Sequence, residues 1–231
     1  MAIFVLVHGA WIGAEIWAPV AERLRREGHD VYAPTLTGVG ARSHLLRADI
    51  DLDTHVMDIV NLIRFHGLDD LVLCGHSYGG MVVTGVADSL PDKIRALVYL
   101  DAFVPKDGQS LLDLTSNRPA PVAVGIAFPP LPPTAFALSG EKEAFYVAHA
   151  TPQPSLTFTQ RLRLSGGIDR VKRRVYIYAN VPQPTTFTQF YERFRDAPGW
   201  KAHTLACTHL VQADMPEALT RILVDAGSPI Y

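Results

Sequence analysis

Short apolar runs alternate along the chain with longer segments in which apolar residues recur every three or four positions. The runs predict strands that are buried on both faces, and the recurring positions predict amphipathic helices between them. This alternation is typical of βαβ units whose strands form a mostly parallel sheet. We therefore expect an α/β fold with strands at residues 3–7, 31–33, 71–74, 96–100, 175–179 and 202–205.

Glycines and polar residues mark where the helices between these strands begin and end. The first helix is expected over residues 15–27, where Gly28 closes it. The second is expected to begin after an N-cap at Asp53 or Thr54 and to end at Gly67. Two further helices are expected over residues 78–90 and between Pro216 and Gly227.

The interval of about residues 103–174 interrupts this alternation, because it is rich in proline and also carries several aromatic side chains. A disordered linker would be poor in aromatic residues, so we expect an ordered insertion. The prediction is a lid, or cap, packed over the strand ends, with a merely structural insertion as the alternative. Residues 1–102 and 175–231 would then form the core.

Composition limits the classes of protein to which the chain can belong. Its 231 residues, 48% hydrophobic and 19% charged, are enough to bury the core of one main domain. A net charge of −2 without a long basic run argues against a nucleic-acid partner. Residues 3–7 are typical of a buried strand and not of a signal peptide, and no segment approaches the roughly 20 apolar residues of a membrane span. We expect a cytoplasmic protein with no membrane partner; its oligomeric state stays open, and a homodimer is compatible with the sequence.

The chain contains two cysteines, Cys74 and Cys207, which are too few for a disulfide framework. Disulfides persist mainly in oxidising compartments. We therefore expect two buried thiols in a reducing cytoplasm instead of a bridge.

The sequence Gly75-His76-Ser77-Tyr78-Gly79 follows directly on an apolar run and precedes a helical pattern. Gly-x-Ser-x-Gly in this context predicts a nucleophile elbow, in which a serine sits on a strained turn between a strand and a helix. The turn brings backbone segments so close together that a Cβ atom at Gly75 or Gly79 would clash. Ser77 is therefore the candidate nucleophile.

A serine hydroxyl needs a base that accepts its proton. In folds with this elbow, the nucleophile, the acid and the histidine follow one another in that order along the chain. His209 fits this order, because it lies between the last strand and the last helix. The neighbouring His76 is expected to point away from the hydroxyl, and four earlier histidines are expected to be solvated or bonded locally: His29, His44, His55 and His66.

The carboxylate that should orient the histidine is missing from its usual place. The loop after residues 175–179 runs from Asn180 to Phe187 and contains no acid. Asp101 ends the preceding buried strand, where a carboxylate is costly unless it has a partner. We therefore assign Asp101 as the triad acid. A structural role for Asp101 remains the alternative, with the orienting group then supplied by Asp214, Glu192 or the amide of Asn180.

Two main-chain N–H groups are needed to hold the oxyanion that develops during acyl transfer. The amide of Tyr78 begins the elbow helix and is the first candidate donor. The amide of Ala10 is the second, because it follows Gly9 at the end of the first strand. Trp11 would flank the acyl pocket together with Tyr78, or would only pack against the core.

Other kinds of chemistry have little support in the sequence. His8 and His76 lack the spacing of a helical zinc pair, and no cysteine pair has a ligand spacing, so no metal is predicted. The glycines Gly38 and Gly40 do not belong to a G-x-G-x-x-G sequence, so a dinucleotide site is not predicted.

Taken together, the segments 4–11, 75–80 and 99–105 resemble the α/β-hydrolase superfamily over nearly the whole chain. More narrowly, they resemble small esterases related to plant methyl-ester esterases and hydroxynitrile lyases, and related bacterial carboxylesterases. The resemblance implies a cap domain, no cofactor and a small apolar or aromatic ester as substrate. It also implies Ser77 and His209 as nucleophile and base, and Ala10 and Tyr78 as oxyanion donors. The candidate substrate-binding residues are Trp11, Phe103, Phe128, Phe136 and Leu210.

The chain departs from the hydroxynitrile lyases of this group at two positions. Those enzymes use a threonine near the oxyanion turn and a lysine just after the histidine, where this chain has Ala10 and Leu210. Without the lysine, no cation would stabilise a leaving cyanide. We therefore expect a serine carboxylesterase that works through an acyl-enzyme. The alternatives are a hydroxynitrile lyase or a lactone or C–C hydrolase on the same site, and a non-catalytic protein that binds a small ligand.

Overall fold

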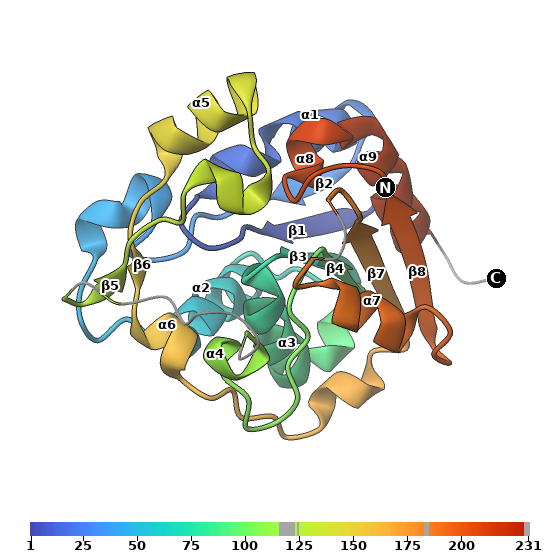
Figure 1. The fold of residues 1–231 in the computed structure, drawn as a ribbon. Coiled ribbons are helices and arrows are strands. Elements are labelled where there is room, and N and C mark those ends of the chain that lie inside the picture. Colours follow the sequence, from blue (N-terminus) through green and yellow to red (C-terminus); the bar gives the residue numbers. More distant parts are fainter. Residues whose placement is uncertain (116–122, 124, 183–184, 229–231) are drawn as a thin grey trace.

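A computed structural model describes residues 1–115, 123, 125–182 and 185–228, and its centre is a six-stranded parallel sheet between two layers of helices (Figure 1). The strand order is β2-β1-β3-β4-β7-β8, and each neighbouring pair is parallel. All six predicted strands are present, with slightly different ends. They are β1 (Ile3–Val7), β2 (Asp30–Tyr32), β3 (Leu71–His76), β4 (Ile94–Leu100), β7 (Arg173–Ala179) and β8 (Trp200–Leu205).

Alternate residues of the central strands enter two separate hydrophobic cores, because successive side chains of a strand point to opposite faces. One face packs against α1 (Ala18–Arg26) and α9 (Pro216–Gly227). The other packs against α2 (Leu52–Phe65), α3 (Gly79–Ser89) and α7 (Thr188–Phe194). Figure 1 shows the two groups of helices above and below the sheet. Burial on both faces explains why the strands appear in the sequence as continuous apolar runs.

The shorter elements connect these layers or extend them. They are the 3₁₀ helices η1 (Ala14–Trp17), η2 (Gly40–Leu45), η3 (Pro91–Lys93), η4 (Pro133–Phe136) and η5 (Gly167–Arg170), the helices α4 (Leu111–Leu114), α5 (Gly140–His149), α6 (Leu156–Thr159) and α8 (Val211–Asp214), and the strands β5 (Ala127–Phe128) and β6 (Gln153–Pro154). The two strands form a small antiparallel sheet of their own.

The predicted start of the second helix is wrong, because the N-cap of α2 is Asp51 and not Asp53 or Thr54. The Asp51 carboxylate accepts the Thr54 N–H at 2.8 Å, and the Thr54 hydroxyl oxygen accepts the Asp51 N–H at 3.4 Å. This reciprocal pair is a capping box, in which Thr54 is the third helical residue. The predicted ends of the first two helices are confirmed, because Gly28 and Gly67 take positive φ angles just after α1 and α2. Gly227, expected to follow the last helix, is instead the last residue of α9.

We expect Asp51→Ala to lower the free energy of unfolding by about 1 kcal/mol, because the N–H and the hydroxyl of Thr54 both lose their acceptor. Asp53→Asn is the control, since Asp53 lies two residues after Asp51, in the first turn of α2, and is not the cap. Urea unfolding followed by circular dichroism measures both variants. Equal losses in the two variants would show that Asp51 does not act as the cap.

The segment from residue 103 to residue 174 packs against the core in two different ways. Its middle part, which contains η4 and α5, lies over the sheet on the side of α8, whereas α6 lies beside α2 (Figure 1). Its last part returns along the end of α3, where the Asp88 carboxylate accepts the N–H groups of Ser165 at 2.6 Å and Ile168 at 3.1 Å. Among the described residues of this segment, those that line the pocket at the strand ends lie between Phe103 and Phe158.

Two further expectations concern cysteines and membrane segments. Cys74 and Cys207 are both buried free thiols, as predicted. Across the described residues, no helix combines the length and the apolar character that crossing a membrane requires.

Candidate active site

Three sharp turns bring the candidate residues to one edge of the sheet. Trp11, Ser77 and Asp101 follow β1, β3 and β4, and they have positive φ angles of 66°, 54° and 40°. Such angles cost about 1–3 kcal/mol each in residues other than glycine, and they are retained mainly at functional sites. The carboxyl ends of neighbouring parallel strands meet at one edge, which is where ligands bind in open α/β sheets.

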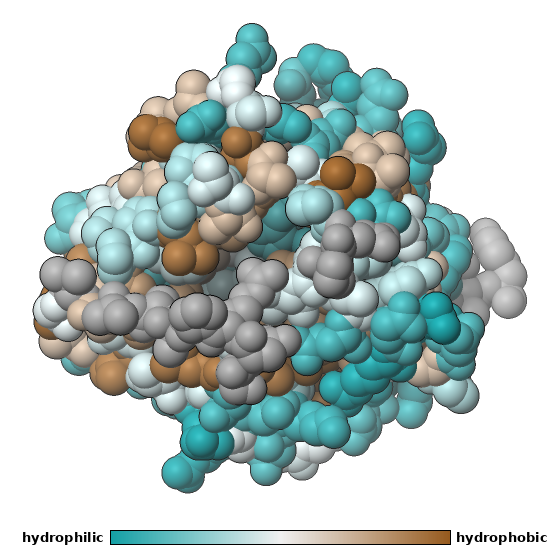
Figure 2. Space-filling model, viewed as in Figure 1, coloured by the Kyte–Doolittle hydropathy of each residue, from teal (hydrophilic) through white to brown (hydrophobic). Residues whose placement is uncertain are grey.

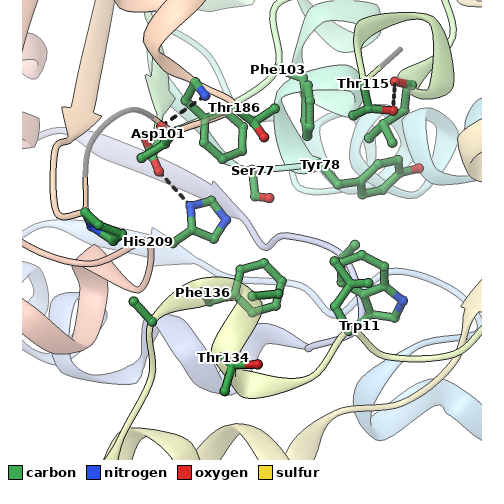
Figure 3. A pocket seen from close by; sticks show the side chains of 18 of the residues that line it. Trp11, Ser77, Tyr78, Asp101, Phe103, Thr115, Thr134, Phe136, Thr186 and His209 are labelled. Atoms are coloured by element: carbon green, nitrogen blue, oxygen red, sulfur yellow. Dashed lines mark hydrogen bonds and ion pairs between the residues drawn. The ribbon is translucent and has the colours of Figure 1, made fainter. Parts of the chain in front are cut away.

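Two glycines make the turn at Ser77 sterically possible, as the motif predicts. A Cβ atom on Gly75 would lie 2.5 Å from the carbonyl oxygen of Gly79, and one on Gly79 would lie 2.7 Å from the carbonyl oxygen of His8. Both distances are shorter than a real Cβ contact allows. The turn leaves Ser77 lining the main pocket of the molecule (Figure 3).

The side chain of His209 is held by Asp101. The Nδ1–H of His209 donates to Oδ2 of Asp101 at 2.6 Å, and Oδ1 of Asp101 accepts the Ala179 N–H at 3.1 Å. Figure 3 shows the imidazole between the carboxylate and Ser77. Because Nδ1 is engaged with the carboxylate, the other ring nitrogen is the one that can exchange a proton with a substrate or a serine.

Asp101 is only 1% exposed, so its charge has little contact with water. Burial raises the pKa of the Asp101 carboxyl, and the hydrogen bond from Ala179 opposes that rise. A buried carboxylate needs partners to compensate for its lost hydration. His209 and Ala179 are those partners, which accounts for an acid at the end of an apolar strand.

The other groups considered for the acid are engaged elsewhere. Asp214 forms an ion pair with Lys142 of α5 and accepts the N–H and the hydroxyl of Thr208. Glu192 lies half-exposed on α7 in an ion pair with Arg195. Asn180 donates its main-chain N–H to Leu205, and its buried side-chain oxygen has no partner among the described residues. In the rest of the predicted loop, Gln183 and Pro184 lie outside the described residues.

The two candidate oxyanion donors are unpaired and lie beside Ser77. Within the part of the chain that the structure describes, the main-chain N–H groups of Ala10 and Tyr78 have no hydrogen-bond acceptor. Both residues line the pocket together with Ser77. The next amide, that of Trp11, is already bonded to Oε1 of Gln153 at 3.1 Å. Unpaired N–H groups beside a nucleophile are suited to hold a developing negative charge.

Two buried histidines support this region, and sequence reasoning missed both of them. His8 accepts the Leu36 N–H at Nε2 and donates from Nδ1 to the carbonyl oxygen of Gly9, and burial lowers its pKa to about 4. His55 was expected to be solvated or locally bonded, but it is fully buried. It bridges the hydroxyl of Tyr78 and the carbonyl of Thr37, at 2.9 Å and 2.8 Å. The sequence places His55 on a helix but does not show which residues that helix packs against. The packing of α2 on α3 brings His55 behind Tyr78, where it is buried.

The main pocket has a volume of about 240 Å³, and most of its lining residues are apolar. Figure 2 shows that this face of the molecule is hollowed near its centre. Three predicted substrate-binding residues line the pocket: Trp11, Phe103 and Phe136. Sequence reasoning missed other lining residues, among them Thr134, Phe158, Thr186 and Phe187.

Two of the predicted substrate-binding residues do not line this pocket. Phe128 stacks on Phe158 at 5.1 Å and accepts the indole N–H of Trp11 at its carbonyl, so it supports the wall from behind. Leu210 is 3% exposed and lines a second, smaller cavity, which His209 also lines. Neither residue lines the main pocket, because the sequence indicates which segments approach the site but not which way each side chain faces.

The imidazole of His209 is flanked by two phenyl rings. Phe187 stacks on it at 4.9 Å with an interplanar angle of 6°, and Phe136 stacks at 5.4 Å with an angle of 16°. Phe136 belongs to η4 and Phe187 immediately precedes α7, so two segments distant in the sequence hold the ring. Together with the bond to Asp101, these contacts restrict the orientations available to the imidazole.

The described residues contain no cluster of three or more His, Cys, Asp or Glu side chains that could hold a metal ion. They also place no lysine or arginine in the lining of the main pocket. The polar groups available there are hydroxyls, the free amides and the Asp101–His209 pair. This set of groups suits acyl transfer to a serine on a neutral substrate.

Comparison with known proteins identifies a relative over nearly the whole chain and others over less than half of it. A carbendazim-hydrolysing esterase of a Nocardioides species is 41% identical over 98% of this chain and 100% of its own length. A polyneuridine aldehyde esterase of Rauvolfia serpentina is 33% identical, but over only 47% of this chain and 41% of its own. An α-hydroxynitrile lyase of Arabidopsis thaliana matches in a similar way, at 34% identity over 44% of this chain and 40% of its own.

Solved structures agree with the fold. An extracellular α/β-hydrolase of a Paenibacillus species superposes with a TM-score of 0.80 and 26% identity, covering 99% of this chain and 100% of its own. A family model described as "Alpha/beta hydrolase family" matches residues 4–222. With the elbow at Ser77 and a parallel sheet that carries the site at its carboxyl edge, the chain belongs to the α/β-hydrolase family.

Proposed function

We propose that this protein is a serine carboxylesterase that hydrolyses small neutral esters through an acyl-enzyme. The observation that carries the proposal is the bond of 2.6 Å between His209 and the buried Asp101 in the pocket that Ser77 lines. A serine, an oriented histidine and a buried carboxylate are the groups required to activate a hydroxyl nucleophile. The esterases among the relatives support the same reaction class.

In the proposed mechanism, Ser77 Oγ attacks the ester carbonyl while His209 Nε2 accepts the hydroxyl proton. The N–H groups of Ala10 and Tyr78 hold the oxyanion of the tetrahedral intermediate. Asp101 stabilises the imidazolium that has formed. The intermediate then collapses, and the alcohol leaves with the proton returned by His209. Water hydrolyses the acyl-enzyme by the same steps in reverse order.

We further propose that the part of residues 103–174 that reaches the strand ends serves as a cap. Its side chains form one wall of the main pocket, with Phe136 covering His209. The ion pair between Lys142 of α5 and Asp214 connects this cap to the loop that carries His209. A wall of this kind excludes water from the reacting groups and strengthens their electrostatic interactions.

The other candidate functions have less support. A lyase of the hydroxynitrile type would need a cation beside the base, and the position after His209 holds the buried Leu210. The idea of a binding protein without activity rested on a missing acid, and Asp101 supplies a carboxylate within hydrogen-bonding distance of His209. The likeness to the Nocardioides esterase makes carbendazim a substrate to be tested first.

The absence of cations among the described lining residues predicts a preference for uncharged esters. We expect kcat/KM to be at least about tenfold higher for p-nitrophenyl butyrate than for the p-nitrophenyl monoester of succinic acid, because an unpaired carboxylate is costly to bury. The two substrates are similar in length and share the leaving group. Equal rates for both would contradict a neutral pocket, and no turnover of any ester or of carbendazim would contradict the proposed function.

A further inference from the structure

A second, much smaller cavity adjoins the main pocket, and Ser77 and His209 belong to the lining of both. Its volume, measured with a water-sized sphere, is about 20 Å³. That space exceeds the roughly 10–15 Å³ that one water molecule requires. Its lining includes Gly9, His76, Ser77 and His209. The cavity is therefore large enough for one water and lies beside the nucleophile and the base.

The ring of His76 presents an unused hydrogen-bond acceptor in this region. His76 is 2% exposed, and its Nε2 lies 2.9 Å from the carbonyl oxygen of His209. A carbonyl only accepts, so Nε2 carries the hydrogen. Burial lowers the pKa of His76 well below its usual value, which keeps the ring neutral. Nδ1 thus has a free lone pair, and among the described residues it has no partner.

Gly9 lies close to this nitrogen and to Ser77, with no room for a larger residue. A Cβ atom on Gly9 would lie 3.2 Å from Nδ1 of His76 and 3.0 Å from Cβ of Ser77. The region that such a side chain would fill is thus bordered by the acceptor of His76 and by the nucleophile. Buried acceptors without a partner are rare and costly in folded proteins, and ordered water commonly satisfies them.

We propose that this cavity binds the water that hydrolyses the acyl-enzyme, with His76 as the positioning residue. The inference rests on the proposed acyl-enzyme mechanism. One hydrogen of the water is donated to Nδ1 of His76, and the other is directed at Nε2 of His209. The water oxygen is then held in the small cavity, beside the acyl group on Ser77.

The chemistry of this step balances without a further reactant. The water oxygen forms a bond to the acyl carbon while one water proton passes to Nε2 of His209. The bond between the acyl carbon and Ser77 Oγ then breaks, and Oγ receives the proton from His209. The product is the carboxylic acid, which retains the second hydrogen of the water. His76 keeps its own proton throughout and acts only through the position of the water.

The test compares water with methanol as acceptor of the acyl group. In His76→Gln, the side-chain amide can still donate to the His209 carbonyl, but no acceptor remains at the position of Nδ1. We expect hydrolysis of the acyl-enzyme to slow about tenfold, the effect of losing about 1.4 kcal/mol in the transition state. Methanol is larger than the single water for which the small cavity has room, so it reacts from the main pocket, and its reaction should be unchanged. With p-nitrophenyl butyrate in dilute methanol, the ratio of methyl butyrate to butyric acid should therefore rise about tenfold.

His76→Asn is the matched variant, because its amide oxygen can take the place of Nδ1 while the bond to the His209 carbonyl is lost. We expect its product ratio to stay near that of the wild type, although its acylation becomes slower. Labelling of Ser77 by a fluorophosphonate at the wild-type rate shows that His76→Gln keeps an assembled site. An unchanged ratio in His76→Gln, or equal shifts in both variants, would overturn the water site. A wild type that forms no acyl-enzyme would instead overturn the proposed function.

Discussion

Ser77→Ala is expected to lower kcat/KM for p-nitrophenyl butyrate by at least about 10⁴-fold, because removing the nucleophile of a serine hydrolase costs up to about 10⁶-fold in kcat. The change removes one oxygen from a residue at a φ of 54°, so the turn itself is kept. The small side chain of alanine also leaves the pocket open. Loss of activity with unchanged binding of a substrate analogue would therefore reflect the missing nucleophile.

A matched serine makes this test specific. Ser228 follows α9 and is exposed, and its hydroxyl donates only to the carbonyl oxygen of Val224. Ser228→Ala should keep full activity and full labelling by a fluorophosphonate, whereas Ser77→Ala should lose both. If the Ser77→Ala enzyme still turns over the ester at the wild-type rate, another residue is the nucleophile, and the acyl-enzyme mechanism on Ser77 is wrong.

Asp101→Asn is expected to lower kcat by about 10³–10⁴-fold, comparable with the loss that the same change causes in the serine proteases. The asparagine oxygen can still accept the Ala179 N–H, so the side chain keeps its place. Its NH₂ group would then face Nδ1 of His209 and donate to it. The imidazole would be held in the wrong tautomer, with its hydrogen on the nitrogen that must accept the serine proton.

The other two carboxylates provide the comparison for Asp101. Glu192→Gln should change kcat less than about twofold, because this side chain lies on the surface of α7 beside Arg195. Asp214→Asn removes the ion pair to Lys142 and weakens the hold on Thr208, so a loss of up to about tenfold is expected. A larger loss in either variant than in Asp101→Asn, measured as kcat on one ester, would mean that the orienting acid has been misassigned.

Much of this architecture is readable from local patterns. Six continuous apolar runs predict a buried parallel sheet, since strands covered on both faces have no polar side. The glycines at 75 and 79 predict the elbow, because only that turn brings backbone so close to their Cα atoms. The N-cap of α2 was harder to predict, since three suitable polar residues lie within four positions. Asp51 is the cap because it and Thr54 form reciprocal hydrogen bonds.

The position of Asp101 shows how much of the triad can be predicted from the order of the strands along the chain. The missing acid after β7 and the isolated acid after β4 are both visible in the sequence. β4 and β7 are neighbours in the sheet, and the Asp101 carboxylate accepts the N–H of Ala179 at the end of β7. A carboxylate at the end of either strand therefore reaches the same region. The order of the strands along the chain suggests that Asp101 replaces the acid missing after β7. The pairing of β4 with β7 is what brings Asp101 within 2.6 Å of His209.

The fold class, the nucleophile turn and the candidates for base, acid and oxyanion donors follow from the sequence alone, because each depends on a local pattern or on chain order. The tertiary structure was needed to establish which aromatic side chains form the pocket. Phe136 faces His209 whereas Phe128 supports the wall from behind, and both come from the same segment. It also decided the roles of His8, His55 and His76, which are buried among segments far apart in the chain. Side-chain direction and burial depend on contacts between distant residues, and a pattern of neighbours along the chain does not contain them.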